Sequence, residues 1–186
     1  MGIQFETDYN METLTAMAKG LRKTVRKKRS RRVHIFAAVV LILGLLTILA
    51  TVAGGEPFGA SGVVTLLALL VVILATVFED RLNAWFARKR LLPGTEHAAA
   101  TFEEDGYVSA MGVTESRFSY AQIVAVAETA RYFVFALSSH HTQAYDKRTI
   151  RGGSVEDFRA FIAEKTGKLV EKSNKSNIVQ KIGENQ

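Results

Sequence analysis

The chain has 186 residues, of which 24 are Lys or Arg and 18 are Asp or Glu, and it contains no Cys. This length suits one domain of ordinary size with attached segments. The missing Cys excludes disulfides, thiolate nucleophiles and Cys-based zinc sites. The formal charge of +6 lies entirely in residues 1–34, since residues 35–186 hold equal numbers of basic and acidic residues. A nucleic-acid-binding domain spreads its positive charge over a folded surface, so this distribution argues against a nucleic acid as the partner.

The first elements in chain order are a short strand and a basic helix. Residues 3–8 alternate between apolar and polar side chains, which predicts a strand. Asn10 is the expected N-cap of a helix whose apolar positions recur every three or four residues, at Leu14, Met17, Leu21 and Val25. This apolar stripe has two interpretations: it lies on a lipid surface, or it packs on the soluble domain.

Two uncharged segments follow, residues 35–53 and residues 60–78. At about 1.5 Å per residue each reaches roughly 28 Å, close to the hydrocarbon thickness of a bilayer at about 30 Å. Neither segment has the polar face that a soluble helix needs. They predict two membrane spans joined by an external turn at residues 54–59. The rest of the chain is too small to bury both as core helices, and the charged start and apolar core are both too long for a cleavable signal peptide.

The charges around these segments predict their orientation. Basic residues directly precede the first segment and follow the second, whereas the link between them carries only Glu56. By the positive-inside rule both termini are therefore expected in the cytoplasm. The absence of ionisable residues within either segment argues against a transporter or a pump. The expected contacts with anionic phospholipid are Arg26, Lys27, Lys28, Arg29, Arg31, Arg32, Arg88, Lys89 and Arg90.

The remainder predicts a juxtamembrane helix and linker at residues 79–94, an α+β domain at residues 95–170 and a flexible tail at residues 171–186. Asp105-Gly106 indicates a β-hairpin, and further segments read as strands, two of them with apolar residues on both faces. Ser154 and Asp157 have the spacing of a capping box at the start of a helix that Gly167 ends. We expect a small antiparallel partial barrel whose open end is covered by this C-terminal helix.

No pattern in the domain predicts catalysis, a cofactor or a metal. His140 and His141 are adjacent, so on a strand they point to opposite faces, and a turn between strands is the expected place for them. The chain has no phosphate-binding glycine motif and no nucleophile elbow, so we do not expect an enzyme. Lys147, Arg148 and Arg151 are candidate contacts for an anionic headgroup or a phosphate, with a solvated loop facing an anionic membrane as the alternative.

Several of these segments together resemble the YcxB-like family of bacterial membrane proteins. The resemblance rests on the two-span hairpin, FEEDG at residues 102–106, YAQIVAVAE at residues 120–128, Phe133, Lys147 and a helix containing Asp157, Phe158 and Phe161. It implies a bacterial inner-membrane protein whose soluble domain has a pleckstrin-homology-like (PH-like) fold of curved antiparallel strands closed by one helix, and it implies no reaction. Such a barrel has seven strands and residues 98–146 supply about six, so we predict that residues 3–8 supply another edge strand.

Two functions from different classes are consistent with these features. The first is a non-enzymatic scaffold or regulator that presents a PH-like domain at the cytoplasmic membrane face and binds a protein segment or a lipid headgroup. The second is a small accessory or immunity-type membrane protein whose hairpin pairs with a larger membrane partner. The expected partners are the lipid bilayer, anionic phospholipid and an unknown protein partner, and a homo-oligomer is left open.

Overall fold

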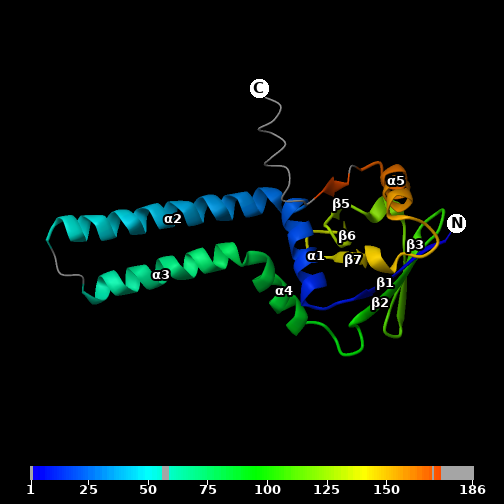
Figure 1. Cartoon of the computed structure of the whole chain (residues 1–186), viewed down its shortest axis with the longest axis horizontal. Coiled ribbons are helices and arrows are strands. Elements are labelled where there is room, and N and C mark those ends of the chain that lie inside the picture. Colours follow the sequence, from blue (N-terminus) through cyan, green and yellow to red (C-terminus); the bar gives the residue numbers. More distant parts are fainter. Residues whose placement is uncertain (1, 56–58, 169, 173–186) are drawn as a thin grey trace, which may run out of the picture.

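The computed structural model describes residues 2–55, 59–168 and 170–172, and it consists of a long helical hairpin attached to a β-rich domain (Figure 1). Residues 56–58 of the expected turn and residues 173–186 of the expected tail lie outside the described residues. The helices are α1 (Met11–Lys23), α2 (Lys27–Ala53), α3 (Ala60–Val77), α4 (Glu79–Lys89) and α5 (Val155–Thr166), with short 3-10 turns at Tyr120–Gln122 and Lys147–Thr149. The strands are β1 (Ile3–Asp8), β2 (His97–Phe102), β3 (Tyr107–Met111), β4 (Thr114–Phe118), β5 (Ala125–Glu128), β6 (Tyr132–Ala136), β7 (Thr142–Asp146) and β8 (Glu171–Lys172).

The strands form two four-stranded sheets, in the orders β1-β2-β3-β4 and β7-β6-β5-β8. The first sheet confirms the edge strand predicted from residues 3–8, because β1 lies at its edge and pairs antiparallel with β2 from Ile3↔Phe102 to Asp8↔His97. Residues 171–172 differ from the expectation of a tail. They form β8, which pairs in parallel with the edge of β5. Two residues are too few to show a strand pattern, so the sequence alone could not predict this pairing.

The two sheets pack against each other through aromatic side chains, and α5 closes the space between them. Phe158 of α5 is fully buried, and its ring centre lies 4.7 Å from that of Phe5, 4.8 Å from Phe102 and 5.0 Å from Phe133. The start of α5 is fixed by the predicted capping box, in which the Asp157 N–H donates to the Ser154 hydroxyl at 3.0 Å. Its end is fixed by Gly167, whose φ of 62° is the left-handed conformation that glycine adopts without strain.

Helix α1 covers the outer face of the second sheet. Every residue of β6 is buried, since Phe133 and Phe135 face the aromatic core while Tyr132 and Val134 pack with Ala16 of α1. This explains the strands with apolar residues on both faces. The stripe of α1 therefore packs within the domain rather than lying on lipid, and the predicted N-cap Asn10 accepts hydrogen bonds from the N–H groups of Glu12 and Thr13.

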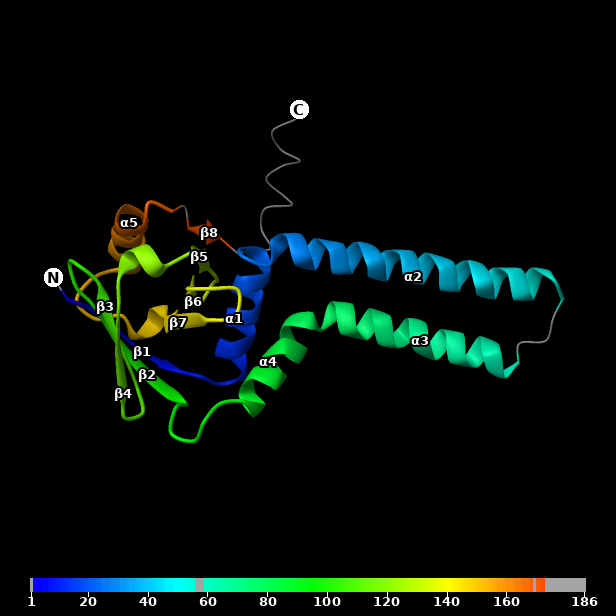
Figure 2. The same cartoon turned by 180° about the vertical axis from the view of Figure 1, so that it is seen from behind.

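Helices α2 and α3 lie side by side and extend away from the domain, as both views show (Figures 1 and 2). They approach closely at Gly44, where an added Cβ would lie 2.5 Å from Cδ2 of Leu69. Both are long and apolar enough to cross a membrane, and α3 has no buried residue. Helix α2 begins at Lys27, ahead of the uncharged segment, and the short turn after Lys23 separates it from α1.

Candidate functional site

The junction between the hairpin and the domain is held by polar contacts among α1, α2 and α4. Arg22 of α1 donates two hydrogen bonds of 2.7 Å to the carboxylate of Asp80 in α4. The neighbouring Glu79 accepts a hydrogen bond of 3.5 Å from the hydroxyl of Ser30 in α2. Nε2 of His34 lies 3.8 Å from Oε2 of the same Glu79. These contacts connect the helix that precedes the hairpin to the helix that follows it.

The basic residues predicted to contact lipid lie where α2 begins and where α4 ends, and most are exposed. Arg26 is the exception, because its Nε donates to the carbonyl oxygen of Ser139 at 2.7 Å and so ties the start of α2 to the turn between β6 and β7. Lys89 lies over the ring of Trp85, 3.7 Å from its centre, and Trp85 and Phe86 are both exposed beside it. The exposed members of the predicted set are Lys27, Lys28, Arg29, Arg31, Arg32, Arg88, Lys89 and Arg90.

The three cations predicted to contact a headgroup do not converge on one site. Nζ of Lys147 is 2.6 Å from a carboxylate oxygen of Glu128 and donates to the carbonyl of Thr129 at 2.7 Å, and only 12% of the lysine side chain is exposed. Arg148 binds Asp146, the residue two positions earlier, at 3.0 Å. Arg151 is exposed and lies 3.4 Å from Glu6 of β1. Each cation therefore has its own acidic partner.

Glu128, at the end of β5, is a buried carboxylate with two cationic partners. Arg159 of α5 donates to both of its oxygens, at 2.7 and 2.8 Å, and Lys147 donates to one of them at 2.6 Å. Burial acts to raise the pKa of Glu128, but the hydrogen bonds from Arg159 and Lys147 outweigh burial and lower the pKa to about 2. This carboxylate fastens α5 to the second sheet.

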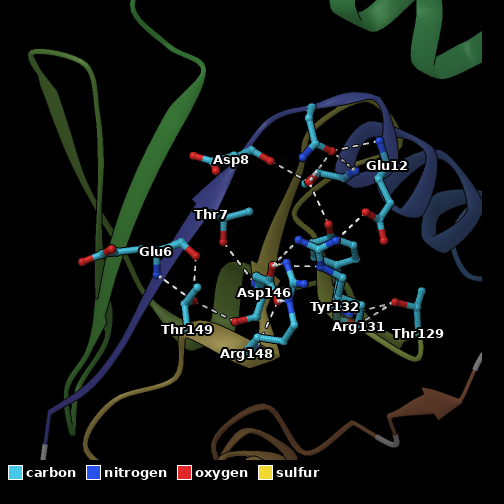
Figure 3. A network of polar contacts seen from close by, with 12 residues as sticks. Glu6, Thr7, Asp8, Glu12, Thr129, Arg131, Tyr132, Asp146, Arg148 and Thr149 are labelled. Carbon is cyan, nitrogen blue, oxygen red and sulfur yellow. Dashed lines mark hydrogen bonds and ion pairs between the residues drawn. The ribbon is translucent and has the colours of Figure 1, made fainter.

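A second buried carboxylate, Asp146 at the end of β7, organises the network in Figure 3. Arg131 and Arg148 both point toward Asp146, with nitrogens 2.8 and 3.0 Å from Oδ2. The backbone N–H of Asp146 donates to the hydroxyl of Thr7 in β1 at 3.1 Å. Arg131 also forms an ion pair with Glu12 of α1. The network joins β1, α1 and β7, and it holds the Arg131 guanidinium in a fixed place.

Beside this network lies a cleft of about 780 Å³ between α1, α4 and the turn that joins β5 to β6. Its lining combines apolar side chains with three cations and one acid. The residues are Met11, Glu12, Thr15, Ala16, Lys19, Arg81, Thr129, Ala130, Arg131 and Tyr132. Among the residues that the structure describes, Lys19 and Arg81 form no ion pair. The sequence did not indicate this cleft, because its residues come from three distant segments with no shared spacing.

The histidines lie outside this cleft. His140 and His141 lie in the exposed turn between β6 and β7, where the sequence placed them. Within the described ranges, no group of three His, Asp or Glu side chains is gathered as metal ligands. The candidate site is thus a cleft lined by three cations, one acid and several uncharged side chains.

The comparison with protein families bears out the resemblance seen in the sequence. Residues 102–162 match the model of the family described as YcxB-like protein. The matched segment runs from the end of β2 through most of α5, and it therefore contains Glu128, Arg131, Asp146 and Lys147. No curated protein and no solved structure matches the chain.

Proposed function

We propose that this chain is an integral membrane protein that presents a non-enzymatic, PH-like binding domain at the cytoplasmic face of a bacterial inner membrane, where it acts as a scaffold or regulator. The observation that carries the proposal is the exposed apolar surface of α2 and α3. Their large side chains, such as Phe36, Leu46 and Val71, are more than half exposed. An apolar surface of this extent needs a cover, and a bilayer of about 30 Å matches the length of the uncharged segments in these helices.

The distribution of cations supports the cytoplasmic orientation. Between Arg32 and Arg81 the sequence contains no Lys or Arg, whereas exposed basic residues lie at the end of the hairpin that carries the domain. Cytoplasmic flanks of membrane spans are enriched in Lys and Arg, and anionic lipid attracts them by about 1 kcal/mol for each residue near the surface. The domain and both termini would then lie on one side.

Two features support the PH-like interpretation of the domain. Strands β1 to β7 form two sheets packed over one aromatic core, and the helix α5 follows the last of these strands and closes the core. The YcxB-like match covers most of these elements. We expect such a domain to bind a ligand rather than to catalyse a reaction. The candidate site is a cleft whose cationic side chains suit an anion.

The polar groups within the hairpin favour an anchor over a surface that recognises a larger membrane partner. The hydroxyls of Thr47, Thr51, Thr65 and Thr76 each donate to the carbonyl oxygen four residues earlier in the same helix. They offer no free donor to another helix, so the hairpin presents an apolar surface that suits lipid.

Cysteine labelling tests the proposal directly, because the chain has no Cys and single substitutions give clean reporters. We expect Lys28→Cys and Lys165→Cys to react with a membrane-impermeant maleimide only after the cytoplasmic side is opened, and Gly55→Cys to react from outside. Leu46→Cys, in the middle of α2, should stay unreactive until detergent is added. Labelling of positions 28 and 165 from opposite sides, or recovery of the intact chain in the soluble fraction, would contradict the proposal.

A further inference from the structure

We propose that the cleft between α1, α4 and the β5–β6 turn binds the phosphate of an anionic phospholipid headgroup. This inference rests on the proposed membrane location and names the ligand class of the binding domain. The nine lipid contacts predicted from the sequence belong to exposed flanking segments, whereas this cleft is a separate, concave site that none of them lines.

The charge of the cleft favours an anionic ligand. Lys19, Arg81 and Arg131 contribute three cations from three elements, against one acid, Glu12. Lys19 and Arg81 have no acidic partner in the part of the chain that the structure describes, and every other lining side chain is uncharged. Charge-assisted hydrogen bonds from Arg and Lys to phosphate are among the strongest that proteins form, and Arg matches phosphate geometry with two parallel donors.

The cleft is also partly preorganised for an anion. The guanidinium of Arg131 is fixed by Asp146, at 2.9 Å from Nε and 2.8 Å from Nη2, and it lies over the ring of Tyr132 at 5.0 Å from the ring centre. On α1, Glu12, Thr15, Ala16 and Lys19 fall on one face of the helix, because residues three, four and seven positions apart share a face. A phosphate would meet in Arg131 a cation that is already held in place, which lowers the entropic cost of binding.

Glu12 occupies one side of Arg131. Its carboxylate pairs with Arg131 at the edge of the cleft, and 57% of the glutamate side chain is exposed. The exposed carboxylate of Glu12 thus occupies the position beside Arg131 that a phosphate oxygen would take. We therefore assign Glu12 as a competitor that the ligand displaces, with Arg131 retaining Asp146 as its second partner.

The position of the cleft favours a lipid as the source of the phosphate. Figures 1 and 2 place α1 and α4, two of the three elements that line the cleft, between the hairpin and the sheets. Arg81 stands in the first turn of α4, directly after α3 ends at Val77. The apolar residues that line the cleft, Met11, Ala16 and Ala130, also suit the glycerol and the first acyl carbons of a lipid better than a free ion.

The test measures lipid binding to the purified full-length protein in a neutral detergent by isothermal titration calorimetry. Short-chain phosphatidylglycerol is the probe, and phosphatidylcholine, glycerol phosphate and inorganic phosphate are compared with it. We expect saturable binding of phosphatidylglycerol that is at least about tenfold tighter than binding of the other three. Equal binding of phosphatidylcholine would overturn the proposal, and equal binding of glycerol phosphate or inorganic phosphate would overturn the lipid as the source.

Variants of the cleft decide where the lipid binds. Lys19→Ala and Arg81→Ala should each weaken binding about tenfold, since each loses one charge-assisted contact worth about a factor of ten. Glu12→Gln should strengthen binding several-fold, an effect that general loss of structure would not produce. Arg117→Ala removes an exposed cation on β4, far from the cleft in the fold, and should bind like the wild type.

Unchanged affinity in both cation variants, or weaker binding in Glu12→Gln, would overturn the assignment of the cleft. Lys19 and Arg81 form no ion pair in the described residues, so we expect their alanine variants to stay folded. Thermal unfolding of each variant checks this. The labelling experiment reports membrane insertion independently. An inserted hairpin with an inactive cleft would therefore contradict this inference alone, whereas a soluble chain would contradict the proposed function.

Discussion

Arg22 of α1 and Asp80 of α4 form a bidentate ion pair, in which Nε and Nη2 each lie 2.7 Å from a carboxylate oxygen. The two residues flank the hairpin, since Arg22 precedes α2 and Asp80 follows α3. The hydrogen bonds that Arg22 donates to Asp80 raise the pKa of Arg22 against the opposite effect of burial. The pair therefore closes the base of the hairpin and fixes the direction in which the helices leave the domain.

We expect this pair to couple the two helices energetically. Arg22→Ala and Asp80→Asn should each destabilise the protein, and the double variant should lose less than the sum, with a coupling energy of about 1–2 kcal/mol. Arg22→Lys keeps the charge but not the planar fork, so it should recover only part of the loss. Thermal unfolding in detergent provides the measurement, and strictly additive effects would show that the pair contributes nothing.

The contact between α1 and β6 predicts an unusual compensation. A Cβ added at Gly20 would lie 2.7 Å from Cγ1 and 3.0 Å from Cβ of Val134, closer than side chains pack. Gly20→Ala raises helix propensity by about 1 kcal/mol, yet the clash should make it destabilising by about 1–3 kcal/mol. Val134→Ala removes the clashing methyl groups, so the double variant should be more stable than Gly20→Ala alone.

The control for this prediction is Lys23→Ala, which replaces a partly exposed basic residue in the last turn of the same helix. It should change the midpoint of unfolding little. If Val134→Ala fails to relieve Gly20→Ala, the close packing of α1 on the sheet is not what makes Gly20 necessary.

The features that the sequence predicted are those that depend on neighbours in the chain. The alternation in residues 3–8, the cap at Asn10, the capping box from Ser154 to Asp157 and the left-handed Gly167 all act through nearby backbone, and the structure confirms each of them. The two apolar helices were also evident, because each consists of one uninterrupted uncharged segment.

The features that the sequence did not predict depend on contacts between distant segments. Lys147 pairs with an acid of β5 and Arg151 pairs with an acid of β1, and these contacts divide an apparent cationic cluster into separate ion pairs. The cleft requires α1 and α4 to pack together, although the whole hairpin separates them in sequence. No period or motif encodes such juxtapositions, so Lys19 and Arg81 looked like two more basic residues near a membrane.

The aromatic core predicts that β1 is part of the domain and not an appendage. Phe5 is fully buried, with its ring centre 5.8 Å from that of Phe102 and 4.7 Å from that of Phe158. Phe5→Ala should therefore cost about 3–5 kcal/mol of stability through lost burial and an unfilled cavity. Gln4→Ala, an exposed neighbour on the same strand, should cost less than about 0.5 kcal/mol. Equal effects of the two substitutions in chemical denaturation would contradict the packing of β1 on this core.

The buried Glu128 predicts a specific dependence of stability on pH. Its pKa falls from an ordinary 4.5 to about 2 in the folded protein, because the hydrogen bonds from Arg159 and Lys147 outweigh the effect of burial. The unfolded chain thus binds this proton first as the pH falls. The stabilisation is fully present above pH 4.5 and is lost between pH 4.5 and pH 2, with an amplitude of about 3 kcal/mol.

Glu128→Gln isolates this contribution from those of other carboxylates. At pH 7 the variant should be destabilised by roughly 3 kcal/mol, since it leaves two cations without their acid. Between pH 5 and pH 2.5 the wild type should lose stability faster than the variant, so the two curves of unfolding free energy against pH converge. Glu115→Gln, on the exposed strand β4, should run parallel to the wild type. Parallel curves for Glu128→Gln as well would mean that the acid sensitivity of the domain arises elsewhere, and that Arg159 and Lys147 do not hold α5 through this carboxylate.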